Sequence, residues 1–141
     1  MTIGRLIEGR DATLTCDVST TVRDAAAILA ERRIGALPVM ENGSIAGMFS
    51  ERDVIYRLRE FGPDMLDMPV GDVMTKPAVT VGPHTPVLSA LALMTRRRIR
   101  HLPVVEDEKM IGFVSIGDLV KYRIDAMESE AAAMRDYIRT A

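Results

Sequence analysis

The sequence carries the same pattern twice, and this duplication constrains the fold more than any other feature. Residues 34–53 align with residues 99–118 without a gap, at a constant offset of 65 residues (99 against 34, 118 against 53). Each copy runs from a Leu-Pro-Val segment through a polar turn and a second apolar segment to Ser-x-x-Asp. A long spacing with only two copies is typical of a pseudo-twofold pair and not of a repeat array.

Both copies have the features of a β-hairpin followed by a helix. The predicted hairpins cover 37–49 and 102–114, and the first has Asn42-Gly43 between its apolar segments, a strong hairpin-turn signal. Ser50 and Ser115 follow the hairpins at the position of a helix N-cap. Each copy therefore predicts strand, turn, strand and helix in this order.

A short strand and a helix are predicted before each hairpin. Apolar residues recur at helical spacing from Thr20 to Arg33, and Thr85-Pro86 is a typical helix start, with a threonine N-cap before proline. Strands are predicted over 14–16 and 78–81. The other predicted elements are a helix over 2–8 with Thr2 as its N-cap, a loop over 64–68 and a helical turn over 70–74.

The last predicted helix begins at Ser115 and continues towards Ile138, because no glycine or proline interrupts it after Gly117. One side of this helix is apolar and either packs on the chain's own core or forms an interface with a partner. The apolar residues are Ile124, Met127, Ala131, Met134 and Ile138.

Each half thus predicts a β-α-β-β-α unit, and the fold class is α/β (α+β), with two tandem units packed about a pseudo-twofold axis and a C-terminal helix. Each unit leaves apolar faces that the other unit can bury. The predicted division is an N-terminal helix and lead-in over 1–13, a first unit over 14–61, a linker and lead-in over 62–78, a second unit over 79–123 and a C-terminal helix extension over 124–141.

The protein is not strongly basic. Eighteen Lys and Arg oppose twenty Asp and Glu, so the net charge is −2 and no global basic field attracts nucleic acid. The single cysteine, Cys16, excludes an internal disulfide and is predicted to be a small buried residue. No apolar run has the length of a membrane span, and no signal-peptide core begins the sequence, so a cytoplasmic location is expected.

The sequence offers little for catalysis. It contains two histidines, one cysteine, no cluster with metal-ligand spacing and no phosphate-binding glycine loop. Ser115, His101 and Asp118 could in principle form a triad, but the first copy has Ala36 in place of the histidine. The element that both copies share is the Ser-x-x-Asp pair and not a triad. We therefore predict a protein that is not an enzyme and has neither a metal site nor a catalytic cofactor.

The conserved spacing of Ser-x-x-Asp allows two compatible interpretations. A serine three residues before an acid forms a capping box at a helix start. A helix N-terminus with a hydroxyl and a carboxylate also binds polar ligands, and an ionised aspartate accepts two hydrogen bonds from vicinal hydroxyls of a ribose. Basic residues are dense from Arg96 to His101. Arg96 and Arg97 are typical of a solvated helix end, whereas Arg100 and His101 lie near the motif and are candidates for a phosphate ligand.

These motifs together resemble the CBS domain family, specifically a pair of CBS domains of the kind called a Bateman module. The resemblance covers about residues 4–123. Val73-Met74-Thr75, ahead of the second copy, is similar to the family's lead-in. The motifs that carry the resemblance are Leu37-Pro38-Val39, Leu102-Pro103-Val104 and the two Gly-x-x-Ser-x-x-Asp-type segments over 47–53 and 112–118.

The resemblance implies two clefts that bind adenosyl ligands such as AMP, ADP, ATP, NAD(H) or S-adenosylmethionine. In similar proteins the aspartate of the motif holds the ribose hydroxyls, and the serine contacts ribose or phosphate. Residues beside the Leu-Pro-Val segment contact base or phosphate, and the strand that opens each repeat lines the base pocket. The implied ligand-binding residues are Thr15, Gly35, Ala36, Pro38, Ser50, Arg52, Asp53, Thr80, Arg100, His101, Pro103, Ser115 and Asp118.

The two copies differ at several of these positions. Arg100-His101 stands where the first copy has Gly35-Ala36, and Arg52 stands where the second has Gly117. We therefore expect two inequivalent clefts, one of them suited to a phosphorylated nucleotide. The predicted function is a regulatory sensor module that binds an adenine nucleotide (AMP, ATP or NAD(H)), forms a homodimer and regulates an unidentified partner protein. The alternative is a ligand-free structural or interaction module in which Ser-x-x-Asp only caps helices.

Overall fold

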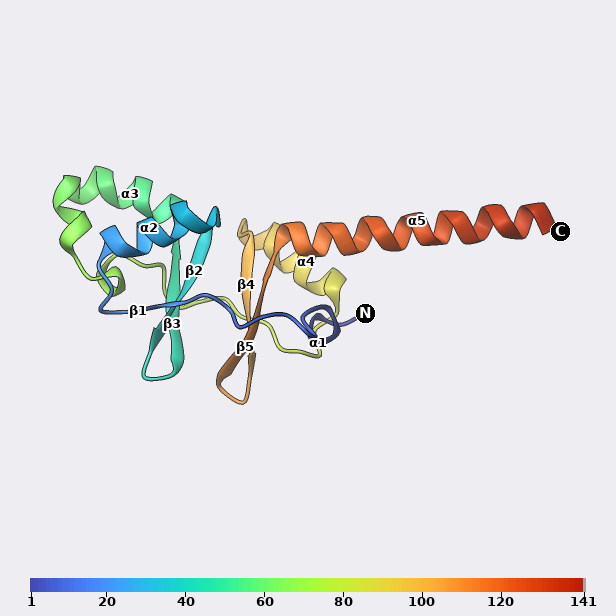
Figure 1. The fold of residues 1–141 in the computed structure, drawn as a ribbon, viewed down its shortest axis with the longest axis horizontal. Helices are drawn as coiled ribbons and strands as arrows, with labels where there is room; N and C mark the ends of the chain where they lie inside the picture. The colour runs from blue at the N-terminus through green and yellow to red at the C-terminus, as the bar shows by residue number, and fades with distance from the viewer. Residues whose placement is uncertain (141) are drawn as a thin grey trace.

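The computed structural model describes residues 1–140 and places the two copies side by side as two lobes (Figure 1). The first lobe has an antiparallel hairpin of β2 (Ala36–Glu41) and β3 (Ser44–Ser50), and the second has a hairpin of β4 (His101–Glu106) and β5 (Lys109–Ser115). In both hairpins the first residue of the first strand lies opposite the last residue of the second. The predicted hairpins and the mixed α and β fold are confirmed. Ala141, the end of the predicted extension, lies outside the described residues.

The two sheets differ by one strand. The first sheet has the order β1-β2-β3, because β1 (Cys16–Asp17) pairs in parallel with β2, whereas the second sheet consists of β4 and β5. The first strand thus begins later than the predicted 14–16. The strand predicted over 78–81 is wrong, because only Val81 forms a bridge to β4.

A proline explains the missing strand. In the first lobe the pairing extends to Val18, whose amide donates to the carbonyl oxygen of Met40 at 3.0 Å. The residue 65 positions after Val18 is Pro83. Since proline has no amide hydrogen, it cannot make the corresponding bond, and the pairing in the second lobe stops at Val81.

The helices α2 (Val22–Arg32) and α4 (Val87–Arg97) end where the sequence predicts. Each is followed by an arginine in the left-handed region, with φ of 53° at Arg33 and 54° at Arg98. This conformation turns the chain sharply out of the helix and into the next strand.

The predicted N-cap of α4 is shifted by one residue. The N-cap of α4 is Pro86, which provides no side-chain cap, whereas that of α2 is Thr21, whose hydroxyl accepts from the amide of Asp24. Thr20 and Thr85 close the preceding turns instead: the hydroxyl of Thr20 accepts from the amide of Asp17, and that of Thr85 accepts from the amide of Gly82, both at 3.2 Å. Thr85 is therefore not the N-cap that the sequence predicts.

Among the short helical segments, two follow the sequence prediction and one does not. Thr2 caps α1 (Ile3–Leu6) as predicted, with its side chain accepting from the amide of Arg5. The predicted turn over 70–74 is the 3-10 helix η2 (Val70–Asp72). The predicted loop over 64–68 is wrong, since 3-10 helix η1 (Gly62–Asp67) follows α3 (Glu51–Phe61) directly.

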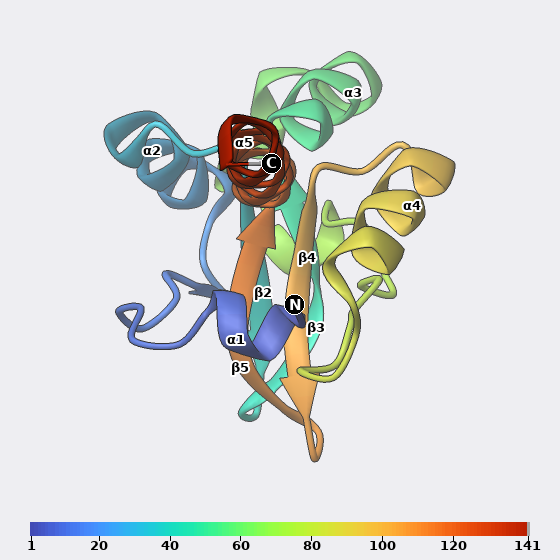
Figure 2. The same cartoon turned by 90° about the vertical axis from the view of Figure 1, so that its right-hand side faces the viewer.

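Each lobe has its own hydrophobic core. Each core is completed by a short helical segment that precedes the other lobe in the sequence and is called its lead-in: α1 for the second lobe and η2 for the first. Ile3 is fully buried in the core of the second lobe, and Val70 is fully buried in the core of the first. Figure 2 accordingly shows α1 against the β4–β5 hairpin. The cores contain, among others, Val22, Leu37, Val39, Phe49 and Met65 in the first lobe and Val87, Met94, Leu102, Val104 and Leu119 in the second.

Matching backbone hydrogen bonds hold the two lead-ins. The amides of Ile3 and Gly4 donate to the carbonyl oxygens of Thr85 and Pro83, at 2.9 and 2.8 Å. In the other lobe, the amides of Val70 and Gly71 donate to the carbonyl oxygens of Thr20 and Val18, at 2.7 and 3.0 Å. The N-terminal segment therefore belongs structurally to the second lobe, and the linker belongs to the first.

The last helix, α5 (Ile116–Thr140), starts in the second lobe and extends far beyond it (Figure 1). Leu119 is fully buried, whereas Ile124 and Met127 are 49% and 52% exposed. The apolar stripe therefore does not pack on the chain's own core, which was one of the two expectations.

Candidate functional site

Both Ser-x-x-Asp pairs form complete capping boxes. At α3, the amide of Ser50 donates to Asp53 Oδ2 at 2.9 Å, and the amide of Asp53 donates to Ser50 Oγ at 3.3 Å. At α5, the amide of Ser115 donates to Asp118 Oδ2 at 2.8 Å, and the amide of Asp118 donates to Ser115 Oγ at 3.1 Å. The capping interpretation of the motif is confirmed for both copies.

The second oxygen of Asp53 is also occupied by the chain. Thr75, which follows η2 in the linker, donates its hydroxyl to Asp53 Oδ1 at 2.8 Å. The amide and carbonyl of Thr75 also pair with those of Met48 in β3, at 2.8 and 2.9 Å. With both oxygens bonded, Asp53 is 8% exposed.

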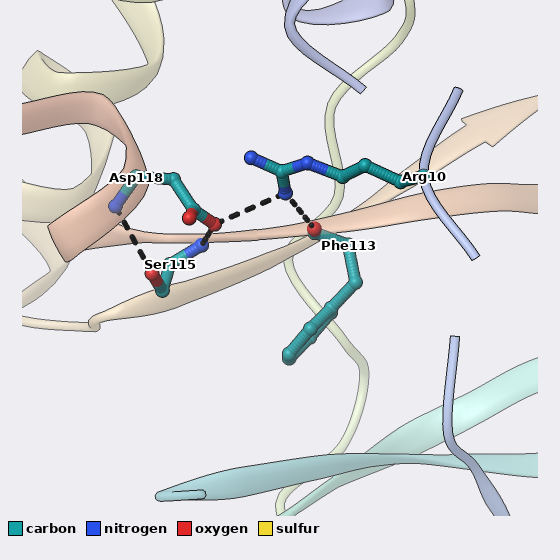
Figure 3. Close-up of polar contacts among 4 residues, drawn as sticks. All are labelled: Arg10, Phe113, Ser115 and Asp118. Atoms are coloured by element: carbon teal, nitrogen blue, oxygen red, sulfur yellow. Dashed lines mark hydrogen bonds and ion pairs between the residues drawn. The ribbon is translucent and has the colours of Figure 1, made fainter. Parts of the chain in front are cut away.

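Asp118 has a different neighbour, Arg10, from the N-terminal segment. Arg10 Nη1 donates to Asp118 Oδ2 at 3.2 Å and to the carbonyl oxygen of Phe113 in β5 at 3.3 Å (Figure 3). Oδ1 of Asp118 accepts no hydrogen bond from residues 1–140, and the side chain is 34% exposed.

The carboxyl group of Asp118 stays ionised under ordinary conditions. Partial burial opposes its charge, but hydrogen bonds from Ser115 and the guanidinium of Arg10 outweigh burial, so its pKa lies below the usual value. Asp118 is thus a charged acceptor with one oxygen open, whereas both oxygens of its counterpart Asp53 are engaged.

A cavity of about 400 Å³ lies beside Arg10, between the N-terminal segment, the end of α2 and β5. This volume falls in the range of sites for small ligands. One part of the wall is apolar, and Arg10 and Arg32 bring two positive charges to it. The lining consists of Ile7, Arg10, Asp11, Thr13, Leu14, Arg32, Ile34, Ala36, Ile111, Gly112 and Phe113.

A second cavity, of about 520 Å³, lies on the Asp53 side of the molecule. It is lined by the linker and one residue of α3, and one of its lining residues, Thr75, is the donor to Asp53 Oδ1. Its lining is Arg57, Gly71, Asp72, Met74, Thr75 and Lys76.

His101 lies where the lobes meet. Its ring stacks on Phe113 with the ring centroids 5.5 Å apart, and it approaches Gly35, where an added Cβ would lie 3.2 Å from the ring. Burial lowers the pKa of His101 below its ordinary value of 6.5, and Arg100 adds to this effect, while Glu51 and Asp118 oppose it. The ring is therefore mostly neutral at pH 7.

The family model for the CBS domain matches residues 10–60 and 70–125, one match for each lobe. The chain belongs to the CBS domain family. It contains a pair of CBS domains, and the two matches cover the two hairpins and the two capping boxes described above.

Curated and solved relatives agree with this assignment. The chain is 39% identical over 131 residues to "CBS domain-containing protein CBSX3, mitochondrial" of Arabidopsis thaliana. The alignment covers 89% of this chain but only 64% of CBSX3, which is less than two thirds of the length of CBSX3. It is 34% identical over 125 residues to CBS domain-containing protein YhcV of Bacillus subtilis, covering 85% and 86%. The crystal structure of CBSX2 in complex with AMP is similar with a TM-score of 0.76 and 28% identity, covering 89% of this chain and 98% of that one.

The structure brings several predicted site residues of the CBS pair together. Ala36 lines the first cavity, and Ser115 and Asp118 are joined to its wall through Arg10. Gly35 and His101 meet between the lobes. Their binding roles stay predictions.

Other predicted residues lie apart from the cavity. Arg52 and Arg100 are exposed, and Thr80 is exposed outside any strand. Pro38 and Pro103 are buried within β2 and β4, while Thr15 is half-buried just before β1.

The sequence-based prediction missed Arg10 and Arg32. Arg10 stands in Gly9-Arg10-Asp11, a helix-breaking segment, and Arg32 stands at a helix end. Neither position carries a local signal for a binding site, since their proximity to β5 depends on how the lobes pack.

None of the helices within residues 1–140 is both long enough and apolar enough to cross a membrane. The cytoplasmic location stays a prediction.

Proposed function

We propose that this CBS pair is a non-catalytic regulatory module that binds an adenosyl ligand in the cavity between the N-terminal segment, α2 and β5. The membership of the chain in the family and the AMP complex of CBSX2 support a ligand of this class. The cavity offers an apolar wall for a base and charged groups for the rest of a nucleotide.

One observation carries the proposal: Asp118, which is bonded to the cavity-lining Arg10, keeps an unbonded oxygen on an ionised carboxylate, whereas both oxygens of Asp53 are bonded. A carboxylate accepts two hydrogen bonds from vicinal hydroxyls, the arrangement on a ribose. The first hydroxyl binds Oδ1. The second hydroxyl approaches Oδ2 and competes there with Arg10, whose contact to this oxygen is longer than that of the Ser115 amide, at 3.2 Å against 2.8 Å.

Arg10 then has a second task in the proposed complex. Once a ribose replaces Arg10 on Asp118, the guanidinium of Arg10 stays in the wall of the cavity that Arg32, at the end of α2, also lines. Two guanidinium groups suit a phosphate, since each offers a fork of N–H donors to its oxygens. The ligand we favour is therefore an adenine nucleotide, AMP, ADP, ATP or NAD(H).

The same geometry suggests how binding would act on other parts of the molecule. The cavity is lined by five residues between Ile7 and Leu14 and by both lobes, so a bound ligand would fix the N-terminal segment and the angle between lobes. We propose that this change is passed to a partner protein and that the module acts as a homodimer.

A ligand panel on matched variants tests the proposal. Thermal unfolding is followed with adenosine, AMP, ADP, ATP, NAD⁺, NADH and S-adenosylmethionine for wild type, Asp118→Asn and Asp53→Asn. Both substitutions weaken a capping box, but only the first removes the open carboxylate. A ligand at a hundred times its dissociation constant adds about 2.7 kcal/mol to the free energy of unfolding.

We expect one or more nucleotides to raise the unfolding temperature of wild type and of Asp53→Asn but not of Asp118→Asn. Loss of the shift in Asp53→Asn alone would move the ligand to the second cavity. No shift with any ligand would contradict nucleotide binding. That result would favour the ligand-free interaction module, in which the two complete capping boxes are the whole purpose of the motif.

A further inference from the structure

The part of α5 beyond the second lobe is exposed on every side. From Arg123 to Thr140, every side chain except that of Ala126 is exposed, including large apolar ones. The exposed fractions are 49% for Ile124, 52% for Met127, 61% for Met134 and 66% for Ile138. A free helix with an apolar stripe of this kind is costly in water and indicates a surface that another helix covers.

The stripe has the period of a coiled coil. Its residues are separated alternately by four and three positions, which is the spacing of a and d in a heptad repeat. Val120, four positions before Ile124, extends the stripe by one residue. Val120, Met127 and Met134 occupy d, and Ile124, Ala131 and Ile138 occupy a. A strict heptad keeps one face against a single partner over many turns, because two helices that coil around each other restore 3.5 residues per turn.

This face is separate from the one that holds α5 in the fold. Ile116, Leu119 and Tyr122 pack into the core of the second lobe. Val120, the first residue of the stripe, is 41% exposed. A partner can therefore reach the stripe from its first position without disturbing the core.

We propose that the partner is a second copy of this chain and that the two α5 helices form a parallel, in-register coiled coil. In such a pair a residue at g faces the residue at e five positions later in the other helix. Arg123 at g then faces Glu128 at e, and Glu130 at g faces Arg135 at e. By twofold symmetry each attraction occurs twice, so the helix is charge-complementary to itself.

The opposite orientation is disfavoured by the same residues. An antiparallel pair that keeps all six a and d positions in contact brings e to e and g to g. Lys121 then faces Arg135, Glu128 faces its own copy and Glu130 faces its own copy. Like charges at these positions destabilise a coiled coil.

The mass of the protein in solution tests whether a second copy of the chain covers the stripe. Analytical ultracentrifugation compares wild type, whose chain mass is 15.5 kDa, with the double variant Ile124→Asp, Met127→Asp. Ser129→Asp, on the side of the helix away from the stripe, is the matched control. We expect wild type and the control to sediment as dimers and the double variant to sediment as a folded monomer that still unfolds cooperatively in urea, because the replaced side chains are exposed in the single chain.

Cross-linking tests the orientation independently of these variants. In a parallel pair Ala131 faces Ala131 of the other copy, so Ala131→Cys forms a disulfide-linked dimer on mild oxidation. Wild type is its control, because Cys16 is 7% exposed. A dimer that resists cross-linking through Ala131→Cys overturns the parallel register. A monomeric wild type at 100 µM, a trimer, or a dimer that survives the double variant overturns the proposed coiled coil.

Discussion

Replacing Arg10 by glutamine removes the guanidinium that joins the N-terminal segment to Asp118 and keeps a polar side chain of similar shape. The ion pair has an N–O distance of 3.2 Å, and its side chains are 39% and 34% exposed. Ion pairs at this exposure contribute about 0–1 kcal/mol, because water screens them. We therefore expect Arg10→Gln to lower the free energy of unfolding by about 1 kcal/mol or less in the absence of ligand.

Binding should respond more strongly and in a ligand-dependent way. A hydrogen bond between charged groups contributes about 1.5–3 kcal/mol, and each 1.4 kcal/mol is a factor of ten in affinity. If Arg10 holds a phosphate, its loss weakens AMP binding about 10- to 150-fold. Adenosine has no phosphate and gains access to Asp118 Oδ2, so its affinity should stay the same or rise.

Isothermal titration of AMP and adenosine into wild type, Arg10→Gln and Arg97→Gln measures both affinities. Arg97→Gln is the matched control, since Arg97 is exposed and occupies in α4 the place that Arg32 has in α2. Equal losses for AMP and adenosine in Arg10→Gln would refute the reasoning, because Arg10 would then act by orienting Asp118. Unchanged AMP affinity would refute it as well.

Three further predictions concern the fold. Gly47→Ala should lower the free energy of unfolding in urea by about 1–3 kcal/mol, because its Cβ would lie 2.6 Å from the backbone oxygen of Thr75. Gly112→Ala is the control and should cost less, since its Cβ meets only the end of a flexible side chain. Equal costs for the two variants would contradict this. Ile3→Ala should cost about 2–5 kcal/mol, since Ile3 is fully buried in the second core, and a change below about 0.5 kcal/mol would show that the N-terminal segment is not part of that core. Because the pKa of His101 is lowered by folding, the unfolded chain takes up a proton first, so the free energy of unfolding should fall as the pH drops below about 6.5. The urea midpoint of His101→Phe should fall less than that of wild type between pH 8 and 5.5.

Features with local determinants could be predicted from the sequence. Asn42-Gly43 specifies its turn by backbone conformation, and the serine and aspartate of each motif meet because they are three residues apart at a helix start. The strand predicted over 78–81 does not form, since only Val81 makes a bridge. The signal against it, Pro83 in place of Val18, was present in the sequence but concerns a single hydrogen bond.

The contacts that define the site could not be predicted from local sequence patterns. Arg10 and Asp118 are 108 residues apart, and no local pattern links them. The constant offset of the duplication also does not predict which residues of the two lead-ins are equivalent. Ile3 and Val70 occupy equivalent places in the two cores but differ by 67 positions (70 against 3), whereas the hairpins differ by 65. A search at constant offset therefore does not align the two lead-ins.

The exchange of lead-ins imposes an order on folding during synthesis. All the segments of the first lobe lie between β1 and Thr75, so this lobe can close as soon as its linker has left the ribosome. The second lobe needs α1, which is synthesised before the first lobe but cannot pack until Thr85 and β5 have been made. Closing so long a loop is slow compared with local contacts. The residues of α1 thus pack later than the first lobe that follows them, and a ribosome paused after the linker would carry a folded first lobe with α1 still unpacked.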